Sequence, residues 1–257
     1  MKSSPVKPVS HDRLPSPTAL LGRVRSEPVR SAVVLVSIPL MLMLFTYFGS
    51  NDFYRRALSG PDTYEDMHGF IYHHVGCFVI LGCGSVLLGA LLGLGPKKLG
   101  LGMGDVAFGM KFCVITIPLL VATLTFAGSY TSDVVAEYPL AKSALASPRL
   151  FLVHACFYLL YYVGWEGFFR GYALFGLAER FGAGAAILIQ TIPSALIHTS
   201  IVVSGKPFSE TLLSVPVGII LGWLAIRTRS IWYGFAIHAA AGLLTDLWQY
   251  LHAHGVL

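Results

Sequence analysis

Apolar residues in this chain gather into long, nearly unbroken runs. Seven runs are of near-spanning length, at about 31–49, 69–94, 111–129, 150–173, 184–203, 209–226 and 231–250. A helix of about 20 apolar residues is long enough to cross the hydrocarbon core of a bilayer. The pattern predicts an all-α fold, a polytopic transmembrane helical bundle. The predicted bundle has seven membrane spans, or eight if one of the long runs is broken into two.

Composition excludes an ordinary soluble fold. The 257 residues are 55% hydrophobic and only 12% charged, with a mean hydropathy of +0.68. Soluble domains carry about 25% charged residues. In a membrane protein, a net charge of +5 reflects cytoplasmic loops rather than nucleic-acid binding. We therefore expect the lipid bilayer as a partner and no nucleic acid.

Three regions follow one another along the chain. Residues 1–30 are rich in Pro, Ser and basic residues and are predicted to form a disordered cytoplasmic tail. This tail does not resemble a signal peptide, because the first apolar run begins near Ser31 and no small-residue cleavage site closes it. Residues 31–149 are predicted to form amino-terminal transmembrane helices, and 150–250 a core of helices with candidate chemistry.

The basic residues predict the orientation. With the amino terminus inside, five of the 18 Lys and Arg residues fall on the outer side. These five are Arg55, Arg56, Lys142, Arg149 and Lys206. Cytoplasmic loops carry the excess of Lys and Arg in membrane proteins. We therefore expect a multi-pass protein of a bacterial cytoplasmic membrane with a cytoplasmic amino terminus.

The four cysteines all lie within apolar runs. They are Cys77, Cys83, Cys113 and Cys156. None forms a CxxC pair, and no histidine stands at zinc-finger spacing. We expect small core hydrophobes rather than disulfides or metal ligands.

Glu166 is an acid set in apolar sequence, and Arg170 follows four residues later. Positions i and i+4 share one face of a helix, so the two charges are placed to pair. Ionisable groups at membrane depth are costly and usually face a protein interior or a wet cavity. The pair therefore marks a candidate functional site.

Two histidines also lie inside apolar runs. His198 follows Gln190, Pro193 and Ser194 on a polar stripe, and small residues follow His238. Taken alone, each histidine fits helix–helix packing or hydrogen bonding, which is common in membranes. Taken together with Glu166, they form a set from three separate spans that could meet in one cavity.

Two chemistries suit that set. Glu166 could act as a general base on water, with His198 and His238 positioning the water or stabilising an oxyanion. Alternatively, the three side chains could bind a catalytic zinc ion with one open position. The chain has no HExxH motif, so the usual zinc-peptidase helix is absent. We expect no cofactor, with zinc as the less favoured alternative.

Three segments resemble the motifs of a known family. The run Trp165-Glu166-Gly167-Phe168-Phe169-Arg170-Gly171 is similar to the first motif of the CPBP/Abi intramembrane endopeptidases, relatives of the type II CAAX prenyl protease. The run ending in His198 is similar to the second motif, and Ser230 to His238 to the third. The resemblance covers about 150–250 and implies an all-helical membrane protease whose glutamate-activated water hydrolyses a peptide bond.

The resemblance also implies the partners. Family members process prenylated CAAX tails or handle other membrane proteins, so a membrane-associated peptide or protein substrate is expected, prenylated or not. By the same resemblance Glu166, His198 and His238 are the catalytic residues and Arg170 supports Glu166.

The chain departs from the family pattern at three positions. Trp165 stands where the motif commonly has its first glutamate, which usually activates the water. Ser194 replaces an aromatic residue, and Gly242 a polar one. Either Glu166 takes over as the base, or this chain is a non-catalytic scaffold or binding protein of the same fold. A transporter is the third alternative, but no internal repeat supports it.

Overall fold

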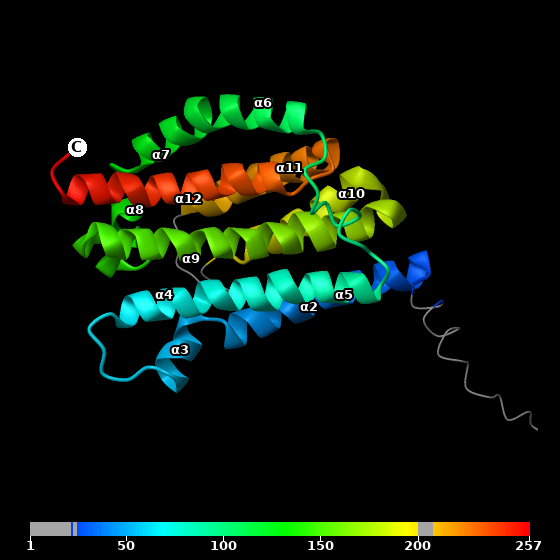
Figure 1. Cartoon of the computed structure of the whole chain (residues 1–257), viewed down its shortest axis with the longest axis horizontal. Coiled ribbons are helices and arrows are strands. Elements are labelled where there is room, and N and C mark those ends of the chain that lie inside the picture. Colours follow the sequence, from blue (N-terminus) through cyan, green and yellow to red (C-terminus); the bar gives the residue numbers. More distant parts are fainter. Residues whose placement is uncertain (1–21, 23–24, 200–207) are drawn as a thin grey trace, which may run out of the picture.

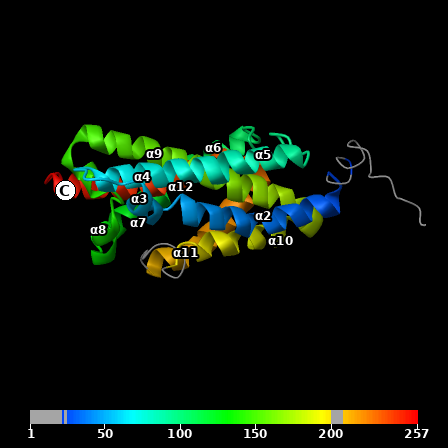
Figure 2. The same ribbon diagram turned by 90° about the horizontal axis from the view of Figure 1, so that it is seen from below.

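The computed structural model describes residue 22 and residues 25–199 and 208–257, and it is a bundle of roughly parallel and antiparallel helices (Figures 1 and 2). Most of the predicted disordered tail, 1–30, lies outside the described residues. The elements are α2 (Glu27–Phe48), α3 (Asn51–Ala57), α4 (Glu65–Gly76), η1 (Cys77–Cys83), α5 (Gly84–Leu91), α6 (Val106–Thr116), η2 (Ile117–Ala122), α7 (Thr123–Gly128), α8 (Ser132–Glu137), η3 (Lys142–Ala146), α9 (Pro148–Glu166), η4 (Gly167–Ala173), α10 (Leu174–Leu196), α11 (Phe208–Thr228) and α12 (Trp232–Ala253). The all-helical membrane fold predicted from the apolar runs is confirmed.

Among the described residues, five helical stretches are long and apolar enough to cross a membrane. They are Glu27–Phe48, Glu65–Leu91, Val106–Gly128, Pro148–Leu196 and Glu210–Thr228. The fourth stretch holds two of the predicted runs, because the chain turns at Gly182, whose φ of 77° interrupts α10. Helix α12 matches the seventh predicted run in position but is not among the five. A count of seven spans therefore stays a prediction.

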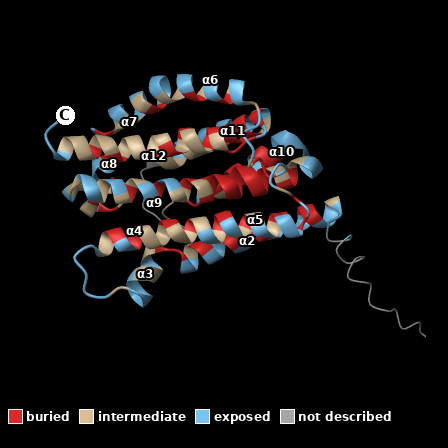
Figure 3. Ribbon diagram, viewed as in Figure 1, coloured by how far each residue is buried: buried red, intermediate tan, exposed pale blue. Residues whose placement is uncertain are grey.

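In the described part of the chain, π-helical segments continue three of the long α-helices: η1, η2 and η4. All seven residues of η4 are buried. Its aromatic rings pack in the largest core cluster against Val34 and Ile38 of α2 and Leu81 of η1. Figure 3 shows this buried region at the junction of α9 and α10. Because π-helical turns are frequent at functional sites, the wide turn after Glu166 is the part of the fold that positions the candidate site.

The outward faces of the long helices are also apolar. On α2, for example, Val36 is 60% exposed and Met43 is 65% exposed. Such surfaces fit contact with lipid tails. The cysteines divide accordingly: all four are free, Cys77 and Cys113 are buried, and Cys83 and Cys156 are exposed. The expectation that all four are core residues was therefore wrong for Cys83 and Cys156, which lie on outward faces.

Glycines let α9 approach η1 closely. A Cβ atom on Gly164 would lie 2.7 Å from the Cα atom of Phe78, and one on Gly82 would lie 2.9 Å from the Cα atom of Gly164. Real Cβ atoms do not approach backbone atoms this closely, so a larger residue forces the two helices apart. The contact fixes the helix that carries Glu166 against its neighbour.

We predict that Gly164→Ala lowers the free energy of unfolding by about 1–3 kcal/mol, the usual cost of overpacking. Gly167→Ala is the matched control in the same region, since a Cβ atom there meets nothing within 4 Å. Titration with a denaturing detergent compares the two variants. Equal stability of Gly164→Ala and Gly167→Ala would show that the helices do not need this close approach.

Candidate active site

Helices α9 and α12 face each other along a polar seam. The seam residues of α9 recur every four positions: His154, Tyr158, Tyr162 and Glu166. Those of α12 recur in the same way: Gly234, His238, Gly242 and Asp246. A spacing of four keeps residues on one helix face. The seam therefore places the two histidines and the two acids between one pair of helices.

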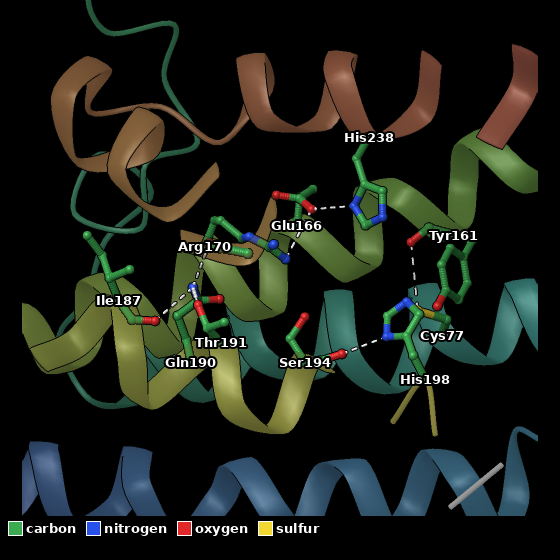
Figure 4. Close-up of polar contacts among 11 residues, drawn as sticks. Cys77, Tyr161, Glu166, Arg170, Ile187, Gln190, Thr191, Ser194, His198 and His238 are labelled. Carbon is green, nitrogen blue, oxygen red and sulfur yellow. Dashed lines mark hydrogen bonds and ion pairs between the residues drawn. The ribbon is translucent and has the colours of Figure 1, made fainter. Parts of the chain in front are cut away.

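Glu166 lies at the centre of a buried charge cluster (Figure 4). Its Oε1 accepts a hydrogen bond from His238 Nδ1 at 2.8 Å and lies 3.2 Å from Arg170 Nη1. Glu166 is fully buried and Arg170 is 2% exposed. The predicted Glu166–Arg170 pair is confirmed, and the structure adds His238 to it.

Gly234 makes room for the carboxylate. A Cβ atom on Gly234 would lie 3.1 Å from Glu166 Oε2, so α12 approaches the acid through a residue without a side chain. Glu166 Oε2 has no hydrogen-bond partner among the described residues. The carboxylate is therefore held mainly through one oxygen, by an imidazole on one side and a guanidinium on the other.

His238 joins the buried pair to open space. Its side chain is 21% exposed and lines a cavity of about 320 Å³. Since a carboxylate only accepts hydrogen bonds, Nδ1 of His238 is the donor and Nε2 of the neutral ring is an acceptor. This is the arrangement in which an acid orients a histidine that then exchanges a proton at its far nitrogen.

His198 reaches the same cavity from the carboxyl end of α10. Its Nδ1 donates to the carbonyl of Ser194 at 2.7 Å, and its ring lies edge-on to Trp165 with the centroids 5.7 Å apart. The carbonyl fixes the tautomer, so Nε2 is again the acceptor of the neutral ring. Two of the three predicted catalytic residues, His198 and His238, therefore border one cavity.

The lining of the cavity is aromatic, imidazole and carboxylate in character. It comprises Phe45, Ser50, Asn51, Asp52, Phe70, His73, His74, Glu137, Leu140, Tyr158, Tyr161, Tyr162, Trp165, Ile197, His198 and His238. Glu166 does not belong to this set and lies behind His238. Trp165, the residue before it, does belong. Trp165 is 1% exposed and its indole Nε1 has no hydrogen-bond partner among the described residues.

A second histidine–carboxylate pair lies further along the seam. His154 Nε2 and Asp246 Oδ2 are 2.8 Å apart and both side chains are fully buried. The ring of His154 stacks on Phe70 at 3.9 Å. Neither residue was among the candidate site residues predicted from the sequence. His154 lies 12 residues before Glu166 and Asp246 lies 8 residues after His238. Both separations are multiples of four, a signal that could have placed each residue on the same helix face as its neighbour in the site.

Within the described part of the chain, no three His, Cys, Asp or Glu side chains are grouped so as to hold a metal ion. Glu166 is turned to His238 and Arg170, while His198 is bonded to a backbone carbonyl. The donor set of these residues therefore does not fit a catalytic zinc ion shared by Glu166, His198 and His238.

One comparison with known proteins matches a family model to this region. Residues 147–244 match the family model described as type II CAAX prenyl endopeptidase Rce1-like. No curated protein and no solved structure matches the chain. The matched segment begins at the start of α9 and contains Glu166, Arg170, His198 and His238. Residues 147–244 are therefore similar to the type II CAAX prenyl endopeptidase Rce1-like family.

Proposed function

We propose that this protein is an active intramembrane endopeptidase, in which Glu166 activates water through His238. The observation that carries the proposal is the 2.8 Å bond between Glu166 Oε1 and His238 Nδ1, with His238 lining a cavity. A buried acid behind an accessible histidine is a recurrent arrangement for general base catalysis. A packing pair would not need one of its members at the edge of a cavity.

The reaction is the hydrolysis of a peptide bond. His238 Nε2 removes a proton from water while the water oxygen attacks the scissile carbonyl carbon. The C–N bond of the resulting tetrahedral intermediate breaks, and the protonated histidine returns the proton to the leaving nitrogen. The products are a carboxylic acid and an amine, and transfer of the remaining proton between them gives a carboxylate and an ammonium group. Glu166 stabilises the imidazolium that forms, and Arg170 holds Glu166 in place.

The proposal uses the residues expected from the sequence but assigns them different roles. A water-activating Glu166 was expected to contact the water itself, whereas its carboxylate is fully buried. His238 therefore takes the proton, and His198 accepts a hydrogen bond from the same water through Nε2. The missing first glutamate of the motif is then not needed as a base. The substrate is a membrane-associated peptide or protein, with or without a prenyl group.

Trp165 supplies a donor for the oxyanion in this proposal. Its Nε1–H is buried in the cavity wall and has no hydrogen-bond partner among the described residues. An indole N–H without a partner in the protein can donate a hydrogen bond to the substrate carbonyl oxygen as that oxygen becomes negative. We predict that Trp165→Phe lowers kcat by about 10²-fold, the effect of removing one oxyanion donor, without a comparable change in KM. Unchanged kcat would remove Trp165 from the reaction.

The proposed function is tested by mapping new amino termini. Membranes of cells expressing the protein or its His238→Gln variant are compared by chemical labelling of free α-amines. Active protein is expected to give a set of internal cleavage sites in membrane proteins that the variant lacks. Identical sets from two equally expressed, folded proteins would contradict the proposal and favour the non-catalytic scaffold.

A further inference from the structure

A second groove lies between α6–η2 and the first turns of α12, which run side by side in Figure 1. It has a volume of about 520 Å³ and shares no lining residue with the cavity that His238 borders. No charged side chain is among its lining residues. The lining includes Met110, Val114, Pro118, Trp232, Phe235 and Ala236.

The groove opens sideways, toward the acyl chains of a bilayer. Met110 is 49% exposed and Val114 is 65% exposed, and both belong to the candidate membrane span Val106–Gly128. From Met110 to Pro118 the helix rises about 12 Å, at about 1.5 Å per residue. The hydrocarbon layer of one leaflet is about 15 Å deep. The groove therefore has the length and the polarity to hold most of one acyl chain.

At one end the groove meets the loop that precedes α6. Trp232 Nε1 donates to the carbonyl of Leu101 at 2.9 Å, and the hydroxyl of Tyr233 donates to the carbonyl of Met103 at 2.7 Å. Trp232, Tyr233 and Met103 all line the groove. These bonds hold both aromatic side chains against the loop. The wall is therefore formed without a ligand, as in most small-molecule sites.

Positive charge gathers at this end of the groove. Residues 92–116 and 224–236, which include the loop and the turn between α11 and α12, hold five basic residues and one acid. The basic residues are Lys97, Lys98, Lys111, Arg227 and Arg229, and the acid is Asp105. Arg227 Nη1 lies 2.9 Å from Asp105 Oδ2, so these two charges neutralise each other. The other four basic residues have no second acid within these two segments.

The other acids at this end of the bundle already have basic partners. Glu179 pairs with Arg30, and Glu27 Oε2 lies 3.8 Å from Arg180 Nη1. Both pairs join α2 to α10 rather than to α6 or α12. The excess of positive charge beside the groove is therefore not offset by these carboxylates.

Lys111 and Arg229 flank the groove. Lys111 is three residues before Val114, which makes the two neighbours on the helix surface, and Arg229 is three residues before Trp232. Both are exposed, and neither forms an ion pair with another described residue. Arg229 has a φ of 58°, a left-handed conformation that is uncommon for residues other than glycine. Such backbone outliers cluster where ligands bind.

We infer that this groove binds one anionic phospholipid, with an acyl chain between α6–η2 and α12 and the phosphate against Lys111 and Arg229. Basic residues at the membrane surface attract anionic head groups. A phospholipid without net charge would leave these cations without a counter-charge, and free phosphate would leave the apolar wall uncovered. The inference does not depend on peptide hydrolysis, because the groove is separate from the cavity that His238 borders.

The head group is tested with two phospholipids that have the same acyl chains. The full-length protein, freed of lipid in detergent, is titrated with phosphatidylglycerol or phosphatidylcholine, and bound lipid is measured by native mass spectrometry. Phosphatidylglycerol is expected to bind roughly tenfold more tightly, the effect of one to two basic residues. Equal affinity for the two lipids would overturn the inference.

The two cations are tested by Lys111→Gln combined with Arg229→Asn. Asparagine accepts a left-handed backbone, so the second change removes the charge without adding strain. This variant is expected to lose the preference for phosphatidylglycerol. The matched control is Arg55→Gln with Arg56→Gln, the same change in charge on α3 at the other end of the bundle (Figure 1), and it should retain the preference. A preference that survives the changes at Lys111 and Arg229 would overturn the inference.

The groove itself is tested by filling it. Val114→Trp places a larger side chain among the lining residues and is expected to weaken phosphatidylglycerol binding by roughly tenfold, as the loss of about two buried methylene contacts would. Ile115→Trp is the control, because Ile115 is 48% exposed and does not line the groove. Equal affinities of the two variants would overturn the inference. So would full competition by an equal concentration of glycerol phosphate, which has the charge but no acyl chain.

Discussion

Replacing Glu166 by Gln is expected to lower kcat by about 10²- to 10⁴-fold, the range for loss of an acid that orients a catalytic histidine. Gln has nearly the same shape, and its amide oxygen can still accept the bond from His238 Nδ1. It lacks the negative charge that stabilises the imidazolium. The measurement is cleavage of a substrate from the amino-terminus map in proteoliposomes.

The matched control is Glu179→Gln, the same chemical change at a side chain that is 63% exposed. The Glu179→Gln variant should cleave the substrate with the same kcat as the unmodified protein. Because Glu166→Gln leaves Arg170 without its counter-charge, the double variant Glu166→Gln with Arg170→Met is measured as well. A folded double variant should be equally inactive. Full activity of either variant would exclude Glu166 from catalysis.

Replacing Arg170 by Met is expected to have the largest effect on stability, a loss of about 3–5 kcal/mol in the free energy of unfolding. Both charges of the pair are removed from solvent: Arg170 is 2% exposed and Glu166 is fully buried. Taking away one partner leaves a buried carboxylate with His238 as its remaining polar contact. Detergent titration of the purified variant measures the change.

The double variant provides the comparison for this prediction. Removing both charges avoids the uncompensated carboxylate, so Glu166→Gln with Arg170→Met should recover most of the lost stability. If the double variant is as unstable as Arg170→Met, the side-chain packing of Arg170 rather than the ion pair stabilises the bundle. If Arg170→Met is as stable as the unmodified protein, the pair has no structural role.

The sequence predicted the membrane helices and part of the site because both rest on local signals. A run of apolar residues defines a spanning helix. The spacing from Glu166 to Arg170 alone places them on one helix face, and the structure bears this pair out. Glu166 and His238 are 72 positions apart in the chain. The prediction that they meet rested on the cost of isolated polar groups in a membrane and on the family resemblance.

The direction in which each side chain faces could not be predicted in the same way. In a soluble helix the polar face marks the outside, but lipid and protein core are both apolar, so a membrane helix gives no such contrast. For this reason Cys83 and Cys156 were wrongly expected in the core. The same ambiguity hid the burial of Glu166 away from the cavity and the exposure of His238 to it.

The turn at Gly182 also could not be predicted from the pattern of apolar residues. The pattern marked the gap between two runs, but it did not show that the helix resumes directly after a single residue of positive φ. The pairing of His154 with Asp246 needed the antiparallel register of α9 and α12, which no local signal supplies. Both features depend on tertiary packing rather than on neighbouring residues.

The most direct test of the claim that Glu166 acts through His238 is a double-variant cycle. Cleavage rates of Glu166→Gln, His238→Gln and the combination are measured with the same substrate in proteoliposomes. Residues that act as one unit are strongly non-additive. The combined variant is predicted to have the same residual rate as His238→Gln alone. A combined loss equal to the product of the two single losses would show that Glu166 acts independently of His238 and would contradict the proposed mechanism.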